Sequence, residues 1–281
     1  DAASPPDPPP DTLTHPPNHH PRHAMPKTPE PKVSAIITLH REGVLAHTTL
    51  HSIERVRRHA EASAIPMELV IVLDRADEET RRIARAHPAV RPTDTITEVG
   101  HGDLSLSRNH GIALARGECI GTFDGDDYFS ENWVTTAWWY VQECGPKTIV
   151  HPEMMIAFGA LNAYWWQVDQ SGPHYRPCAQ LMLNFWNACA FARREAFRDF
   201  PYVVARVGEA GFGFEDWHWN CETIAAGYAH RPALGTVRFE RRKASGSLNA
   251  AHQSVSAVIR PSAFFDRLDL LLPGEAGRAA P

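Results

Sequence analysis

The stretch Cys119-Ile120-Gly121-Thr122-Phe123-Asp124-Gly125-Asp126-Asp127-Tyr128 joins an apolar run to three carboxylates within four residues. The apolar run has the composition of a buried strand. Acids this close repel one another and raise each other's pKa unless a cation neutralises them. A solvated acidic turn is the alternative, because Asp and Gly are good turn residues. The stretch therefore predicts a strand that ends in either a turn or a divalent-cation site.

Apolar runs and helical patterns alternate along the chain on both sides of this stretch. Strands are expected at residues 33–39, 69–73, 95–99, 119–123 and 148–156. Helices are expected at 44–62, 77–86, 104–116 and 130–143, with Gly117 ending the helix at 104–116. This alternation is typical of an α/β fold in which helices flank a mostly parallel sheet.

The carboxyl ends of the expected strands carry most of the polar residues of interest. In parallel sheets, ligands bind beyond these ends. The rule places residues 38–42, Asp74 and residues 124–127 along one edge of the sheet. Because the topology brings these positions together, whatever their charge, the cation site is favoured over the solvated turn.

Composition excludes several classes of protein. The chain has 281 residues, a net charge of -5 and a pI near 6.4, so no broad nucleic-acid-binding surface is expected. It contains no run of about 18 apolar residues, so no integral membrane segment is expected. Five scattered cysteines without a CxxC pair argue against a disulfide framework or a zinc cluster. They fit a reducing compartment and predict a cytoplasmic location, with peripheral membrane attachment as an alternative.

Three motifs follow one another in a definite order. These are Val70-Ile71-Val72-Leu73-Asp74, then Ser107-Arg108-Asn109-His110-Gly111 with Gly117-Glu118 and the acidic stretch, then Gly211-Phe212-Gly213-Phe214-Glu215-Asp216-Trp217. Together they resemble the family 2 glycosyltransferases, which have the Rossmann-like GT-A fold, from about residue 33 to about residue 256. The second motif is the most specific, because an Arg-Asn helix followed by Gly-Glu and a DxD strand is uncommon by chance.

The resemblance implies a metal-dependent, inverting glycosyltransferase of glycan or polysaccharide biosynthesis. Such an enzyme moves a hexosyl or N-acetylhexosaminyl group from a nucleotide-diphosphate sugar to a hydroxyl of a glycan or other acceptor, using Mn²⁺ or Mg²⁺. UDP is the first choice of nucleotide, with dTDP and GDP as alternatives. Asp216 matches the general base, and Glu215 lies beside it. A positioned carboxylate suits this role, because an acceptor hydroxyl is a poor nucleophile near neutral pH.

The remaining site residues divide into donor contacts and metal ligands. Asp74 matches the contact to the nucleotide base, Arg108 lies near the ribose and phosphates, and Arg242 or Lys243 clamps the diphosphate from a C-terminal loop. The full set of nucleotide-sugar contacts is Thr38, Glu42, Asp74, Arg108, Asp124, Gly125 and Arg242. The expected metal ligands are Asp126, Asp124, Asp127 and His252.

The expected domain organisation is one catalytic domain between two linkers. Residues 1–32 form a disordered tail rich in Pro and His, and residues 261–281 form a C-terminal linker. Residues 33–260 form the catalytic domain, in which 33–127 bind the nucleotide and 128–260 bind the acceptor. Linkers at both ends suggest other domains of a longer polypeptide as partners.

Two other functions fit parts of the sequence. A non-catalytic module that binds a sugar nucleotide or scaffolds a larger enzyme would keep the fold, but the presence of both the acidic stretch and Glu215-Asp216 argues against it. A nucleotidyltransferase of related architecture would carry a Gly-rich basic loop after the first strand, and Leu39-His40-Arg41-Glu42-Gly43 matches that pattern poorly.

Overall fold

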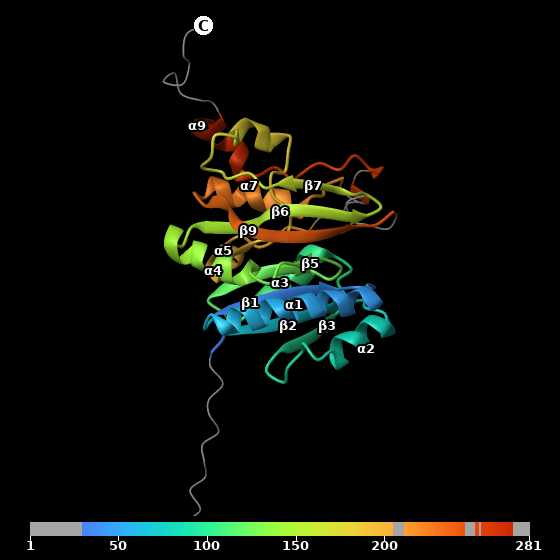
Figure 1. The fold of residues 1–281 in the computed structure, drawn as a ribbon. Helices are drawn as coiled ribbons and strands as arrows, with labels where there is room; N and C mark the ends of the chain where they lie inside the picture. The colour runs from blue at the N-terminus through green and yellow to red at the C-terminus, as the bar shows by residue number, and fades with distance from the viewer. Residues whose placement is uncertain (1–29, 205–210, 245–250, 253, 272–281) are drawn as a thin grey trace, which may run out of the picture.

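A mixed sheet of nine strands organises the described part of the chain, which a computed structural model places at residues 30–204, 211–244, 251–252 and 254–271 (Figure 1). The strand order is β3-β2-β1-β4-β8-β6-β9-β5, and β7 pairs with β6. The strands are β1 (Val33–Leu39), β2 (Met67–Asp74), β3 (Thr95–Val99), β4 (Cys119–Asp124), β5 (Tyr128–Phe129), β6 (Thr148–Gly159), β7 (Ala163–Trp166), β8 (Phe191–Arg193) and β9 (Ala229–Arg242). The helices are α1 (Val44–Ala62), α2 (Glu78–Ala86), α3 (Leu104–Leu114), α4 (Trp133–Cys144), α5 (Arg194–Asp199), α7 (Glu215–Ala225) and α9 (Leu268–Leu271), with 3₁₀ turns η1 (Pro177–Leu181) and η2 (Ala263–Asp266).

Helices cover both faces of the sheet, as the period-2 alternation of β1 requires. Ile37 packs in the core formed with α1, α2 and α4, whereas its neighbour Ile36 packs in the core formed with α3, α5 and Trp219 of α7. Because both faces are buried, every residue of β1 and β2 is buried, which explains their continuous apolar runs. The predicted α/β fold is confirmed.

The parallel half of the sheet matches the predicted pattern closely. The order β3-β2-β1-β4 is parallel throughout, and Thr38 of β1 lies opposite Asp124 of β4. The predicted role of Gly117 as a helix stop is wrong, because α3 ends at Leu114 with Ala115 in an extended conformation. Gly117 instead lies against β1, where a Cβ would approach the backbone nitrogen of Ser34 to 2.6 Å.

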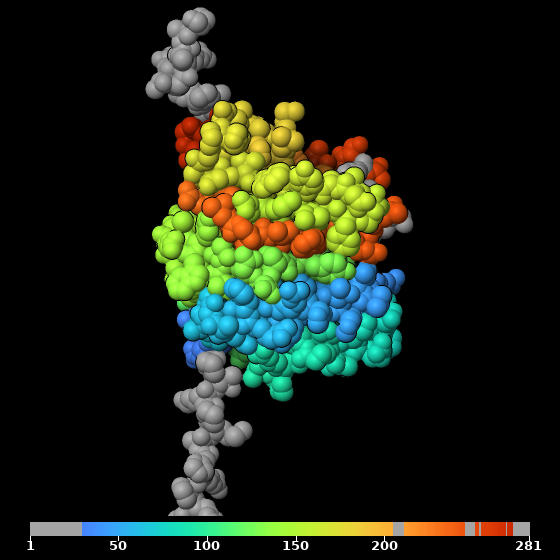
Figure 2. All heavy atoms as spheres, in the orientation of Figure 1, coloured from blue at the N-terminus to red at the C-terminus, as the bar shows by residue number. Residues whose placement is uncertain are grey.

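The second half of the chain extends the sheet with antiparallel and parallel pairs. Figure 2 shows the N-terminal residues, in blue and cyan, in the lower part of the view and the residues of β6, β7 and β9 above them. β6 pairs with β7 antiparallel and with β9 parallel, so that Trp165, Met155 and Arg238 lie opposite one another on one face of the sheet. This face carries side chains that line the site described below.

The segment after residue 260 differs in part from the linker predicted for residues 261–281. Its residues 263–271 form η2 and α9, and Phe264 is fully buried beside Trp186 and Cys221. Residues 272–281, and residues 1–29 of the predicted tail, lie outside the described residues. In the described part of the chain, no helix is long and apolar enough to span a membrane.

Candidate functional site

A cavity of about 790 Å³ lies beyond the carboxyl ends of β1, β2 and β4. Every site residue predicted from the sequence lines this cavity: Thr38, Glu42, Asp74, Arg108, Asp124, Gly125, Asp126, Asp127, Glu215, Asp216, Arg242 and His252. Residues far apart in the sequence therefore share one site, as the strand topology predicts. Their individual roles stay predictions.

The acidic loop, residues 124–127, turns tightly against the end of β1. A Cβ on Gly125 would lie 2.4 Å from Cδ2 of Leu39 and 2.7 Å from the carbonyl oxygen of Thr38. Any side chain at this position would push the loop away from β1, so the close approach requires glycine. The turn holds the three carboxylates at the carboxyl ends of β1 and β4.

A chain of alternating charges joins the predicted motifs. The guanidinium of Arg108, from α3, donates to Asp124 at 2.7 Å and to Glu215 of α7 at 2.9 Å. Arg238, from β9, donates to the other oxygen of Asp124 at 2.7 Å and to Asp127 at 2.8 Å. All but Asp124 are at least nine-tenths buried, so the network fixes the relative positions of α3, β4, α7 and β9.

The two arginines affect the carboxylates of the acidic loop unequally. Burial alone would raise the pKa of Asp124, but Arg108 and Arg238 outweigh it and hold the pKa at about 2. Burial raises the pKa of Asp127 to about 7; Arg238 opposes this shift, and the carboxylates of Asp124 and Asp126 add to it. Asp124 therefore holds its negative charge more firmly than Asp127.

Asp126 is the carboxylate of the loop that fits a divalent cation best. Its partner is Lys243, whose Nζ lies 2.7 Å from Oδ2, and the pair is 16% and 33% exposed respectively. Among the described residues, no three His, Cys, Asp or Glu side chains gather closely enough to hold an ion alone. Mg²⁺ commonly takes only one or two carboxylates together with substrate phosphates, an arrangement that Asp126 allows. Asp124 and Asp127 would first have to release their arginines.

The ring of His252 packs against Phe214, the residue directly before α7. The backbone N–H of Phe214 donates to Nδ1 at 3.4 Å, and the two rings meet edge to face with centroids 4.6 Å apart. A neutral imidazole that accepts at Nδ1 carries its proton on Nε2, and burial lowers the pKa of His252, which favours this neutral form. Nε2 is buried without a partner among the described residues. In this tautomer it is a hydrogen-bond donor, which suits a phosphate oxygen better than a metal ion.

Asp216 lies in the first turn of α7 and is held by the loop before β8. The side-chain amide of Asn184 donates to Oδ2 of Asp216 at 3.2 Å, and Asn220 orients Asn184 by donating to its oxygen at 2.9 Å. Burial raises the pKa of Asp216 to about 7, and the neighbouring Glu215 adds to this shift. Because Glu215 is engaged by Arg108, Asp216 is the more available base of the pair.

Asp74 uses its carboxylate to hold the loop that follows β3. It accepts the backbone N–H groups of Gly102 at 2.9 Å and Asp103 at 3.2 Å, and the hydroxyl of Ser107 at 2.8 Å. A carboxylate has about four acceptor positions, so one is left for a ligand. Any contact between Asp74 and a nucleotide base would therefore also position this loop.

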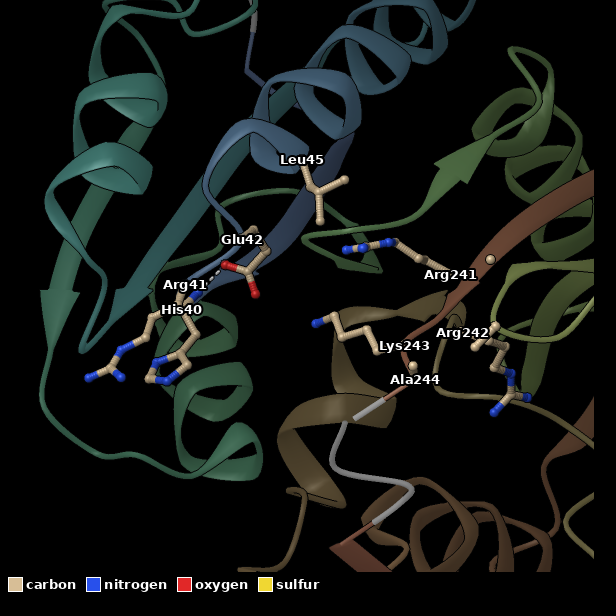
Figure 3. A pocket seen from close by; sticks show the side chains of 10 residues that line it. His40, Arg41, Glu42, Leu45, Arg241, Arg242, Lys243 and Ala244 are labelled. Atoms are coloured by element: carbon tan, nitrogen blue, oxygen red, sulfur yellow. Dashed lines mark hydrogen bonds between the residues drawn. The ribbon is translucent and has the colours of Figure 1, made fainter. Parts of the chain in front are cut away.

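A second cavity of about 720 Å³ adjoins the first between α1 and the end of β9. Figure 3 shows Arg241, near the end of β9, and Lys243, directly after β9, extending toward Glu42 and Leu45, whereas Arg242 turns away. Arg242 pairs with Glu240 at 3.2 Å and lies 6.0 Å from the ring centroid of Trp165. Of the two predicted clamp residues, Lys243 is therefore the one beside the acidic loop. Burial raises the pKa of Glu42, which lies between the two cavities.

Sequence reasoning missed Arg238 and Asn184. Arg238 had a usable signal, because Arg238, Glu240 and Arg242 alternate with Val237 and Phe239 in a strand pattern. Such alternation puts three charged side chains on one face of a strand, and a charged face on a strand inside a sheet needs partners. Asn184 lies in an irregular loop, where no periodic pattern singles it out.

Comparison with solved structures identifies the fold. TarS of S. aureus, residues 1–349 in complex with UDP-GlcNAc, superposes with a TM-score of 0.61 at 15% identity, over 85% of this chain and 65% of that chain. The mannosyltransferase PcManGT from Pyrobaculum calidifontis, in complex with GDP-Man and Mn²⁺, gives a TM-score of 0.52 at 17% identity, over 86% of this chain and 69% of that chain. The chain thus spans about two thirds of the length of either neighbour, and both share its GT-A fold.

Comparison with sequences identifies the family. No curated protein sequence matches the chain significantly. The glycosyl transferase family 2 profile matches residues 34–200, which include β1 to β8, the acidic loop and the Arg108 helix. The chain therefore belongs to glycosyl transferase family 2.

Proposed function

We propose that the chain is a metal-dependent inverting glycosyltransferase with Asp216 as its general base. The observation that carries the proposal is the position of Asp216, half-buried and with a raised pKa, in one cavity with Asp126 and the Arg108 network. A nucleotide-diphosphate sugar is the donor, supported by neighbours that bind UDP-GlcNAc and GDP-Man. A UDP-sugar is the first choice, and the transferred group is a hexosyl or N-acetylhexosaminyl unit.

The proposed reaction needs a single base. The acceptor hydroxyl donates to Asp216, which takes its proton while the acceptor oxygen bonds to the anomeric carbon. The bond from that carbon to the diphosphate oxygen breaks on the opposite side, so the configuration inverts. A base with a pKa near 7 is matched to this task, and general-base help of this kind contributes roughly 10²–10⁴-fold. Asn184 keeps the carboxylate in place.

Neutralising the charge on the leaving diphosphate is the second requirement. A divalent cation, Mn²⁺ or Mg²⁺, would neutralise that charge when bound, with Asp126 holding it. Lys243, now paired with Asp126, lies where it can exchange this partner for a phosphate oxygen. His252 would donate from Nε2 to another phosphate oxygen.

The other predicted contacts belong to the nucleoside end of the donor. Thr38 and Asp74 lie at the carboxyl ends of β1 and β2, and Arg108 lies on α3 and lines the same cavity. We assign this part of the site to the nucleotide. The region from residue 128 to residue 260 then supplies the acceptor side, including Asp216. The acceptor is a hydroxyl of a glycan or a similar molecule.

Asp216→Asn tests the proposal directly. With Mn²⁺ and either UDP-GlcNAc or GDP-Man, transfer or donor hydrolysis should fall at least 10²-fold, while the donor Kd stays within about twofold. Glu222→Gln, on the same helix but outside the cavity, is the matched control. Wild-type kcat/KM should rise with pH through about 7, because Asp216 acts only when ionised.

Two outcomes would overturn the proposal. Transfer that survives Asp216→Asn would place the base elsewhere. Wild-type protein that binds nucleotide but turns over no donor would favour the non-catalytic sugar-nucleotide-binding module.

A further inference from the structure

Gln167 is a buried glutamine whose side-chain amide is unpaired. It is 5% exposed, and neither its Nε2 nor its Oε1 has a partner among the described residues. A buried amide without hydrogen bonds costs folding free energy, so such a group calls for an explanation. Gln167 lines the cavity that contains Asp216, which supplies one.

The β-sheet register directs Gln167 into this cavity. Its backbone N–H donates to the carbonyl of Glu153 at 2.8 Å, which continues the β6–β7 ladder by one residue. Gln167 therefore shares a sheet face with Trp165, which also lines the cavity. Tyr164 and Trp166, on the opposite face, are 64% and 59% exposed.

The cavity that Gln167 lines has aromatic walls, and the loop that contains Trp186 also holds the proposed base. The indole N–H of Trp186 donates at 2.7 Å to the carbonyl of Val168, the residue after Gln167. Asn184, two residues before Trp186, holds Asp216. A pocket with aromatic walls and a few placed polar groups suits a sugar ring, which has apolar C–H faces and a hydroxyl edge.

We propose that Gln167 is a specificity-determining residue that hydrogen-bonds neighbouring polar groups of a sugar ring packed against Trp165. Its Oε1 accepts from one group, and its Nε2 donates to the next. The inference rests on the proposed function. The ring belongs either to the donor or to the acceptor, and the chemistry recognised is the same in both cases. Gln167 positions the ring and exchanges no proton with it.

Gln167→Met tests the inference, because methionine keeps the length of the side chain and removes its hydrogen bonds. With the better of UDP-GlcNAc and GDP-Man, kcat/KM should fall roughly 10- to 100-fold. Gln180→Met is the matched control, since Gln180 is fully buried, has an unpaired Oε1 and does not line the cavity. It should leave kcat/KM within about twofold.

The kinetic constants show whether Gln167 contacts the sugar of the donor or that of the acceptor. A raised donor KM assigns the ring to the donor, and a raised acceptor KM assigns it to the acceptor. Binding of UDP or GDP alone should be unchanged in Gln167→Met, and its Tm should not fall, because an unpaired amide has been removed. If wild-type protein turns over no donor, the proposed function fails, and the ratio of sugar-nucleotide Kd to nucleoside-diphosphate Kd still tests Gln167. The inference is wrong if both kcat/KM and this ratio change by less than twofold in Gln167→Met. It is also wrong if the variant binds UDP, GDP and their sugar derivatives all more weakly by the same factor.

Discussion

Arg238 should be the most sensitive single position of the charge network. It is 3% exposed and donates to Asp127 and Asp124 and, at 2.9 Å, to the side-chain oxygen of Asn187. Arg238→Met keeps most of the side-chain volume and removes every one of these hydrogen bonds. Two carboxylates would then remain buried or half-buried, with only Arg108 to compensate Asp124.

The expected loss follows from the burial of these charges. Removing one partner of a buried ion pair costs about 3–5 kcal/mol, because the other charge stays desolvated. Exposed pairs contribute about 0–1 kcal/mol, so Arg55→Met should change stability little: Arg55 and Glu131 are 57% and 54% exposed. A domain of ordinary stability, about 5–15 kcal/mol, would stay folded with the Arg238 loss and can be measured.

Urea unfolding of four proteins at pH 9, where the carboxyl group of Asp127 is ionised in the wild type, measures the effect: wild type, Arg238→Met, Asp127→Asn and the double variant. Asp127→Asn removes the stranded charge and keeps an oxygen that can accept from the backbone N–H of Arg241, at 2.9 Å in the wild type. The double variant should therefore be more stable than the sum of the two single losses predicts, by about 1–3 kcal/mol. A loss below about 1 kcal/mol in Arg238→Met, or additive losses in the double variant, would refute the reasoning.

Three further predictions concern the metal, a buried histidine and the loop after β3. Asp126→Asn should weaken Mn²⁺-dependent binding of UDP or GDP in calorimetry, and an unchanged Mn²⁺ dependence would count against its ligand role. Burial lowers the pKa of His151 from 6.5 to about 3, so its neutral ring stabilises the fold above pH 6.5 and this contribution is lost as the pH falls toward 3. When the pH falls from 7 to 5, the wild type should lose about 2 kcal/mol more stability than His151→Gln, as measured by urea unfolding. Equal losses in both proteins would contradict this. Asp74→Ala should speed amide hydrogen exchange at Gly102 and Asp103, which lose their acceptor, and unchanged exchange would mean that the loop is held by other contacts.

Local patterns in the sequence predict the parallel half of the fold well. β1 and α1 have the bounds that apolar periodicity gives, because β1 lies within the sheet, α1 covers it, and burial decides their residues. β3, a half-buried strand at the edge of the sheet, also has the predicted bounds. The end of α3 is less predictable. Gly117 resembles a helix stop in the sequence, but its place is determined by a close approach to Ser34, 83 positions earlier. Contacts of this kind leave no periodic signal.

The candidate site, too, could be predicted only in part. Asp74, the acidic loop and Asp216 could be predicted because they lie at the end of a recognisable strand or in the first turn of a recognisable helix. Their pairing could not be predicted, because it depends on Arg238 of β9, which reaches Asp124 and Asp127 only after the second half of the sheet has formed. Gln167 directly follows β7 and Asn184 lies in an irregular loop, and only the three-dimensional arrangement shows that they line the cavity.

The unequal pairing of the three aspartates has a consequence for donor binding. Asp124 and Asp127 are held by buried arginines, which an incoming ligand could displace only at a large cost in desolvation. Asp126 is held by Lys243 in a partly exposed pair, which is easily exchanged. Under the proposed function, a donor diphosphate with its cation would offer a positive partner to Asp126 and a negative partner to Lys243, so both charges would stay compensated when their contact opens. The rest of the network can then keep its geometry during binding, which leaves the acidic loop organised before the donor arrives.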